Sequence, residues 1–153
     1  MTGPRRRSPR LQDTVRLSAD GLGKVLGDLE ARVMQAAWKI GCPAPARAVH
    51  TEVVKRHQVA LLTVVTVLNK LVIKGLLTRA KRDDLLHYEA AISEQELTAH
   101  ASRRIVEGIL SLGSEAVTTS MVDVLAEQDP EQLAELGRLI RRRLRAEEER
   151  DDR

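Results

Sequence analysis

Apolar residues recur at helical spacing in two segments of the first third of the chain. In residues 28–40 the repeating positions are Leu29, Val33, Ala36, Ala37 and Ile40. Asp28 is the expected N-cap of this helix, Gly41 its C-terminal stop and Trp38 its anchor in the core. In residues 44–57 the repeating positions are Ala46, Val49 and Val53. The spacing predicts one amphipathic helix in each segment.

The next segment, "TVVTVLNKL", has two different faces when it is placed on a helix. Its apolar stripe consists of Val64, Val67, Leu68 and Leu71. The opposite side carries Thr63, Thr66, Asn69, Lys70 and, one turn later, Ile73. The pattern predicts a third helix that ends at Gly75.

After Gly75 the apolar period changes from helical spacing to alternation. A charged turn from Lys81 to Asp84 separates two alternating runs, which contain Leu77, Arg79, Leu86, Tyr88 and Ala90. This pattern predicts a two-stranded hairpin. Three short helices followed by a hairpin are typical of a winged helix-turn-helix domain, in which the hairpin is the wing.

From Ser93 onwards the pattern is helical to the end of the chain. "SEQE" is a capping box, and "DPEQ" starts the last helix with Asp129 as cap and Pro130 in the first turn. The pattern predicts three helices in this segment, the first of which stops near Gly113. They have no obvious core of their own, so we expect their apolar stripes to pack against a second copy of the chain. The predicted dimerisation residues are Leu97, Ile105, Ile109, Val117, Met121, Leu125, Leu133, Leu136 and Ile140.

The patterns together predict a mainly α-helical fold in four parts. A flexible basic arm at 1–24 precedes a winged helix domain at 25–92. A helical dimerisation region follows at 93–146, and a disordered charged tail ends the chain at 147–153.

Composition restricts the classes of function. Of the 153 residues 42% are apolar, but only Trp38 and Tyr88 are aromatic, which indicates an aliphatic, helical core. The single cysteine, Cys42, excludes an intramolecular disulfide and fits a cytoplasmic protein. The longest apolar run is too short to span a bilayer. Because no catalytic motif or metal-ligand spacing is present, we expect neither an enzyme nor a cofactor.

Positive charge is concentrated in one part of the chain. No Asp or Glu occurs from Val53 to Arg82, whereas this stretch contains Lys55, Arg56, Lys70, Lys74, Arg79, Lys81 and Arg82. Together with Thr63, Thr66 and Asn69 these residues predict contacts with double-stranded DNA. An ordinary solvated helix face is the alternative for the third helix, and for Lys55 and Arg56 the alternative is a complement to the helix dipole.

Several segments resemble the penicillinase repressor family, the BlaI/MecI-like transcriptional regulators. They are "LGDLEARVMQAAW", "ARAVHTEV", "TVVTVLNKLVIKGLL" and "HYEAAIS", within a match over about 26–144. The resemblance implies a homodimeric repressor that binds an inverted-repeat operator, with the third helix as recognition helix. By position it places Thr63, Thr66, Asn69 and Lys70 at the major groove, and Lys81 and Arg82 of the wing near the DNA backbone.

The chain departs from the family pattern in three places. Leu61 and Leu62 stand where family recognition helices usually open with Tyr-Thr, which removes hydrogen bonds to phosphates or bases. The chain has no Phe, so the family's proteolytic induction at an Asn-Phe bond cannot operate in that form. We therefore expect repression to be relieved by a protease that cleaves at another site or by an unknown inducer. It also lacks the C-terminal cysteines of the copper-responsive branch.

Leu61 and Leu62 also suggest a second hypothesis from another class. A dimeric winged-helix module could bind proteins and have no specific DNA binding. Salt-dependent binding to DNA from its own promoter would separate the two hypotheses.

Overall fold

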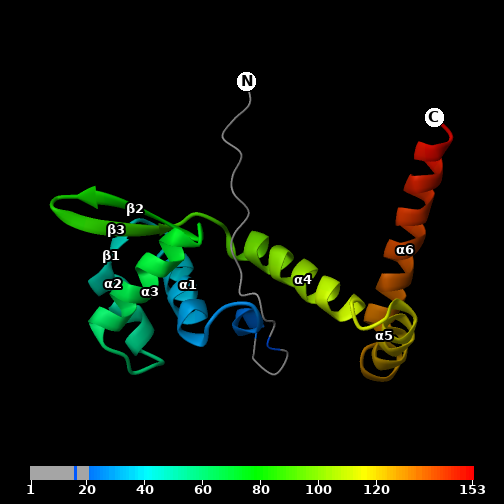
Figure 1. Ribbon diagram of the computed structural model, residues 1–153, viewed down its shortest axis with the longest axis horizontal. Helices are drawn as coiled ribbons and strands as arrows, with labels where there is room; N and C mark the ends of the chain where they lie inside the picture. Colours follow the sequence, from blue (N-terminus) through cyan, green and yellow to red (C-terminus); the bar gives the residue numbers. More distant parts are fainter. Residues whose placement is uncertain (1–15, 17–20) are drawn as a thin grey trace. The chain divides into compact units, whose positions relative to one another are not determined.

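The computed structural model describes residue 16 and residues 21–153, and the chain divides into two compact units between Ile105 and Val106. The first unit contains η1 (Gly21–Lys24), α1 (Asp28–Ile40), β1 (Ala44–Pro45), α2 (Ala46–Val54), α3 (Leu61–Ile73), β2 (Leu77–Arg82), β3 (Leu85–Ala90) and most of α4 (Glu94–Leu110). The second contains the end of α4, α5 (Ser114–Gln128) and α6 (Pro130–Asp151) (Figure 1). The mainly helical winged fold predicted from the sequence is confirmed.

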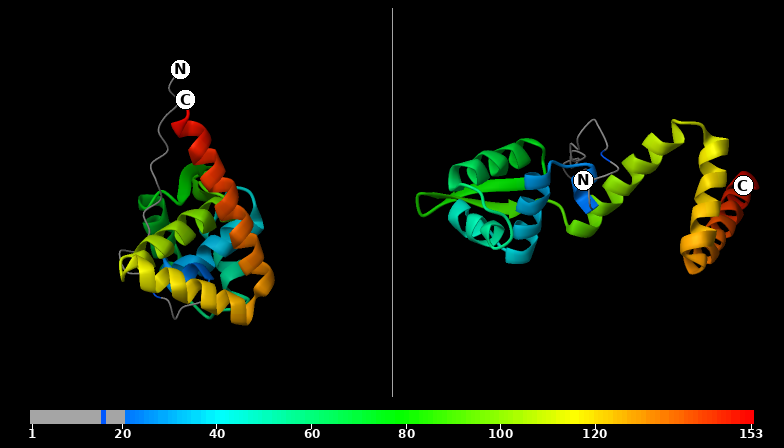
Figure 2. Two further views of the ribbon diagram at one scale, coloured as in Figure 1. Left: turned by 90° about the vertical axis from the view of Figure 1, so that its right-hand side faces the viewer. Right: turned by 90° about the horizontal axis from the view of Figure 1, so that it is seen from below.

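The three helices of the first unit pack on one another because each has one apolar side. α1, α2 and α3 contact each other pairwise, and the sheet lies beside them (Figure 2). The core that they share is aliphatic: its fully buried large side chains are Val25, Leu26, Val33, Met34, Val49, Val64, Leu68, Leu71, Leu76, Leu77 and Leu97. Trp38 packs at the edge of this core, and its Nε1 donates to the Ile92 carbonyl at 2.9 Å. This bond joins α1 to the segment that leads into α4.

The start of α1 differs by one residue from the sequence prediction. The N-cap is Gly27, whose backbone N–H donates to Glu30 Oε2 at 2.9 Å, and the expected cap Asp28 is the first helical residue. The Asp28 carboxylate instead accepts from Arg16 Nη2, also at 2.9 Å. Gly41 ends the helix as predicted, with a φ of 72° that favours glycine.

The sheet has one strand more than the sequence predicted. The short β1 pairs antiparallel with β3, so that the strand order is β1-β3-β2. Pro45 is tolerated there because β1 is an edge strand. Two residues in front of a helix give no alternating pattern, and therefore β1 could not be recognised from the sequence.

The wing is tighter than the four-residue charged turn expected from the sequence. β2 extends through Arg82, which pairs with Leu85, so only Asp83 and Asp84 form the turn. Both have positive φ values, 49° and 63°, the conformation of a two-residue hairpin loop whose twist matches the strands. Lys81 and Arg82 therefore belong to a strand, and the tip itself is acidic.

Two predicted boundaries, that of the basic arm and that of the charged tail, differ in the structure. Residues 21–24, assigned to the flexible arm, form η1, and Leu22 packs against the core. The arginines Arg5, Arg6, Arg7 and Arg10 lie outside the described residues. At the other end α6 continues to Asp151, so residues 147–151 are helical instead of disordered. The good helix formers of this segment and the ion pair between Arg143 and Glu147 support the extension.

The capping signals predicted at Ser93 and Asp129 are confirmed. At α4 the Ser93 side chain accepts from Glu96 N–H and the Glu96 side chain accepts from Ser93 N–H, both at 3.1 Å. At α6 Asp129 Oδ1 accepts from Gln132 N–H at 3.1 Å. None of the helices in the described part of the chain has the length and apolar character needed to cross a membrane.

Candidate nucleic-acid interface

α3 presents the outer face predicted from its periodicity, and this face is more apolar than expected. Val64, Val67, Leu68 and Leu71 are buried, whereas the exposed side chains are Leu62, Thr63, Thr66, Lys70 and Ile73. Leu62 and Ile73 are each 76% exposed. Because successive helical residues are about 100° apart, Leu62, Thr66 and Ile73 lie within about 40° of one another on the wheel. Leu62 was not among the residues predicted for this face, although the same helical wheel places it there.

The hydroxyl group of Thr66 is used within its own helix. Thr66 Oγ1 donates to the carbonyl oxygen of Leu62, one turn earlier, at 3.0 Å. Its proton is therefore engaged, while the oxygen can still accept and the methyl group adds to the apolar surface.

Asn69 connects α3 to the wing. Its Oδ1 accepts two hydrogen bonds, one from Arg79 Nη1 at 2.8 Å and one from the Tyr88 hydroxyl at 2.9 Å. Arg79 and Tyr88 face each other across β2 and β3, and Tyr88 is buried. The Asn69 oxygen is thus occupied by the fold, and only its amide N–H groups remain to donate to a ligand.

Lys74 forms an ion pair inside the first unit. Its Nζ lies 2.7 Å from Glu30 Oε1, and the two side chains are only 25% and 11% exposed. Burial raises the pKa of the Glu30 carboxyl, but hydrogen bonds from Lys74 and from Gly27 N–H, with the charges of Lys74 and Lys70, outweigh it and lower the pKa below its usual 4.5. This pair joins the C-terminal end of α3 to the N-terminus of α1.

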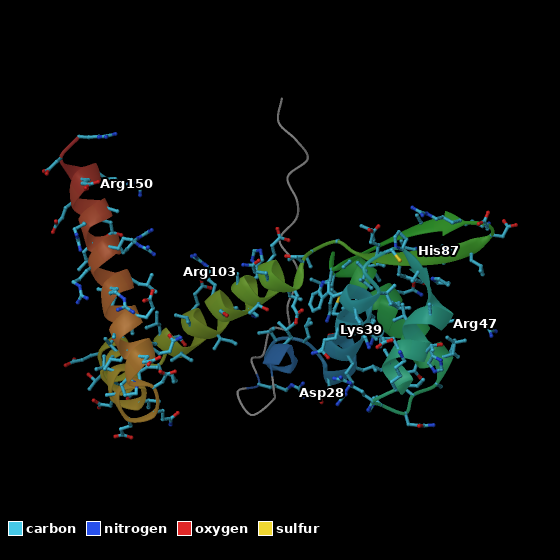
Figure 3. The ribbon with its side chains drawn as sticks, turned by 180° about the vertical axis from the view of Figure 1, so that it is seen from behind. Asp28, Lys39, Arg47, His87, Arg103 and Arg150 are labelled. Carbon is cyan, nitrogen blue, oxygen red and sulfur yellow. The ribbon has the colours of Figure 1, made fainter. Side chains whose placement is uncertain are left out.

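The cations at the end of α2 differ in their surroundings. Lys55 Nζ donates to Glu52 Oε2 at 2.7 Å, and Lys39 bonds to the other oxygen of the same carboxylate. These two hydrogen bonds lower the pKa of the Glu52 carboxyl. Arg56 is exposed. Arg47, in the first turn of α2, is exposed too, and its side chain points away from the helices (Figure 3). Arg47 was not among the residues predicted to bind DNA.

Comparison with known proteins agrees with the fold. The family model described as penicillinase repressor matches residues 26–142. The chain belongs to the penicillinase repressor family. Two proteins called transcriptional regulator BlaI, from the Mycobacterium tuberculosis strains CDC 1551 / Oshkosh and ATCC 25618 / H37Rv, are each 34% identical to it over 104 residues. Each match covers 68% of this chain and 62% of the relative's length.

In the wing the side chain of Lys81 is paired with a carboxylate of the hairpin tip, Asp84. Lys81 Nζ lies 3.5 Å from Asp84 Oδ1, while Arg82 is exposed. Facing residues of β2 and β3 share a side of the hairpin, so Arg79, Lys81, Leu86 and Tyr88 lie on one side and Arg82 on the other. Leu85 and Leu86 near the tip are exposed. Among the described residues no group of three His, Cys, Asp or Glu side chains is placed to hold a metal ion.

The predicted dimerisation residues divide between the two units. Leu97 is completely buried in the core of the first unit, so it is not available to a second chain, and Ile105 packs against the same core. The prediction for these two positions assumed that α4 is separate from the winged domain, but Leu97, Ala101 and Ile105 of α4 pack in or against the core of that domain. The other seven residues, Ile109, Val117, Met121, Leu125, Leu133, Leu136 and Ile140, are half-buried or exposed.

The second unit leaves a large part of its apolar surface uncovered. α5 and α6 pack against each other, yet neither helix has a buried residue. The exposed large apolar side chains of this unit are Val106, Leu110, Leu112, Met121, Val122, Val124, Leu139, Ile140 and Leu144. A surface of this kind marks an interaction site in a soluble domain.

Proposed function

We propose that this protein is a sequence-specific DNA-binding transcriptional regulator, a homodimeric repressor that binds an inverted-repeat operator through α3 in the major groove. The observation that carries the proposal is the outer face of α3. It is exposed along its whole length and lies in a stretch from Val53 to Arg82 without a single carboxylate. Family membership supports the same reading.

The N-terminal end of α3 suits a polyanion. Its N-cap, Ala60, offers no side-chain hydrogen bond, and the first turn contains no acidic residue. The cap and first turn of α3 therefore do not neutralise the positive end of the helix dipole, and the N–H groups of this turn can donate to a phosphate. With this end near the DNA, Leu62, Thr63 and Thr66 enter the groove first.

The contacts within the fold divide the predicted DNA-binding residues into two groups. Thr63, Thr66, Lys70, Arg56 and Arg82 keep the role of touching DNA. Asn69 and Arg79 hold the wing against α3, and Lys74 holds α3 against α1, so we assign these three mainly to positioning the reading surface. Lys55 and Lys81 each have a carboxylate neighbour that reduces their attraction for phosphates.

The apolar surface of the second unit supports the proposed dimer. Two copies that cover each other's α5 and α6 would bury the side chains that a single chain leaves in water. A two-fold dimer presents two copies of α3, which fits an inverted repeat.

The test is binding of the full-length protein to labelled DNA from its own upstream region at several salt concentrations, measured by fluorescence anisotropy. We expect specific binding that weakens steeply with salt, because Lys and Arg displace counterions from phosphates. Lys70→Gln should weaken binding to all sequences and reduce the salt slope by about one. The matched control is Lys39→Gln, since Lys39 is bonded to Glu52 in α2. Absence of binding at low salt would refute the proposal.

One observation favours a second candidate. The high exposure of Leu62 and Ile73 on α3 also fits a dimeric winged-helix module that binds proteins without specific DNA binding. This candidate predicts dimerisation with no salt-dependent affinity for the upstream DNA.

A further inference from the structure

We propose that Leu62 determines operator specificity by packing against the C5-methyl group of a thymine in the major groove. The inference rests on the proposed function and deepens it. In this proposal apolar contact at the start of α3 selects thymine, and hydrogen bonds to the bases contribute less to recognition of the operator.

Leu62 occupies the place on α3 from which a side chain reaches furthest outwards. The centre of the buried stripe, near Leu71, is about 180° from Leu62 on the helical wheel, at about 100° per residue. Leu62 is 76% exposed, in the first turn of the helix, at the end that lacks a side-chain cap. No described element of the chain covers it, so a groove that accepts this end of α3 would meet Leu62 first.

The hydrogen-bonding capacity around Leu62 is small. The Leu62 carbonyl accepts from Thr66, which uses the only proton of the Thr66 hydroxyl. Asn69, the next polar residue toward the centre of this face, has its oxygen bonded to Arg79 and Tyr88. The groups left near Leu62 are its own methyl groups, the Thr66 methyl, the Thr63 side chain, the Thr66 oxygen as an acceptor and the Asn69 N–H groups as donors.

Thymine is the base that presents an apolar group in the major groove, and apolar side chains distinguish it through that methyl. The positive charge around Leu62 favours DNA over an apolar protein surface as the partner that Leu62 contacts. Lys70 and Arg56 are exposed in the same carboxylate-free stretch, which attracts a polyanion and opposes a purely apolar partner.

Deoxyuridine provides the test, because it pairs like thymine and lacks only the methyl group. A duplex that contains the footprinted upstream site is made with each thymine replaced singly by deoxyuridine, and dissociation constants are measured by anisotropy. For the unaltered protein we expect at least one replacement in each half-site to weaken binding about fourfold, the equivalent of about 0.8 kcal/mol for one buried methyl group. For Leu62→Ala that loss should disappear, with weaker binding to the thymine duplex.

Ile73→Ala is the matched control. Ile73 has the same exposure as Leu62 and nearly the same direction on the wheel, but lies about 16 Å further along the helix at about 1.5 Å per residue. This variant should keep the full deoxyuridine effect. Unchanged circular dichroism and melting of Leu62→Ala exclude a folding defect, as expected for truncation of an exposed side chain to a good helix former.

The outcomes separate this inference from the proposed function. Specific, salt-dependent binding that no deoxyuridine replacement weakens would overturn the role of Leu62 and leave the regulator proposal intact. An equal deoxyuridine loss in Leu62→Ala and in the unaltered protein would also overturn it. Absence of DNA binding by the unaltered protein would overturn both, in favour of the protein-interaction module.

Discussion

Asn69 lies on the polar side of α3, but its side chain is bonded within the fold. Its position on the polar side of α3 predicts contact with DNA, but its side-chain oxygen joins α3 to both strands of the wing through Arg79 and Tyr88. Periodicity reports the side of a helix on which a residue lies. It does not report which strand packs over that side.

Asn69→Ala should therefore destabilise the domain. Loss of the acceptor leaves the hydroxyl of buried Tyr88 without its partner, which costs about 1 to 3 kcal/mol in the free energy of unfolding. Urea denaturation followed by circular dichroism measures the change. Thr66→Ala is the control, because its hydroxyl bonds only within α3, and should change stability by less than about 0.5 kcal/mol. Equal stability of the two variants would contradict the positioning role of Asn69.

Among the contacts between elements, the ion pair of Glu30 and Lys74 fixes α3 on α1. Both side chains are largely buried, and the Glu30 carboxylate also accepts from the N–H of Gly27 at the start of α1. Removal of either partner would leave a desolvated charge, so the pair is maintained by the cost of breaking it. The packing of α3 on α1 thus depends in part on an ion pair that lies away from the outer face of α3.

The lowered pKa of Glu30 sets the direction of a pH effect. A carboxyl whose pKa is lower in the folded state stabilises the fold above its unfolded pKa of about 4.5, and this contribution is lost as the pH falls through the folded value. Glu30→Gln should lower the free energy of unfolding by about 1 to 3 kcal/mol at pH 7. The difference from the unaltered protein should shrink as the pH falls below about 4.5 and through the lowered pKa of Glu30.

Urea denaturation between pH 7 and pH 3 checks this prediction. Glu89→Gln, at an exposed position of β3, is the control and should follow the unaltered protein throughout. A difference between Glu30→Gln and the unaltered protein that stays constant with pH would show that the carboxylate charge is not responsible.

For the molecule as a whole, the second unit is the part that a single chain leaves incomplete. α5 and α6 contact each other, but neither buries a residue fully. Small helical units without a core of their own gain stability by association. We therefore expect the two units to unfold differently, and the second to depend on protein concentration.

Ile140→Asp should split the proposed dimer. Ile140 is half exposed on α6, so the change places a charge in the proposed interface with little damage to the packing of α5 on α6. Sedimentation velocity should show a shift towards the monomer, with weaker operator binding. Ala134→Asp adds the same charge about 120° away on the helix and should remain dimeric. A dimeric Ile140→Asp would refute this position for the interface.

The sequence by itself determined the helices of the winged domain, the hairpin, the caps at Ser93 and Asp129 and the family, because these depend on local periodicity, turn chemistry and residue order. Only the tertiary structure decided which members of the polar face remain available. Asn69 and Lys74 are bonded to residues 10 or more positions away in the chain, and Leu97 is buried in a core formed by distant segments. Partners so far apart in sequence leave no periodic signal, whereas the exposure of Leu62 follows from both the helical wheel and the packing around it.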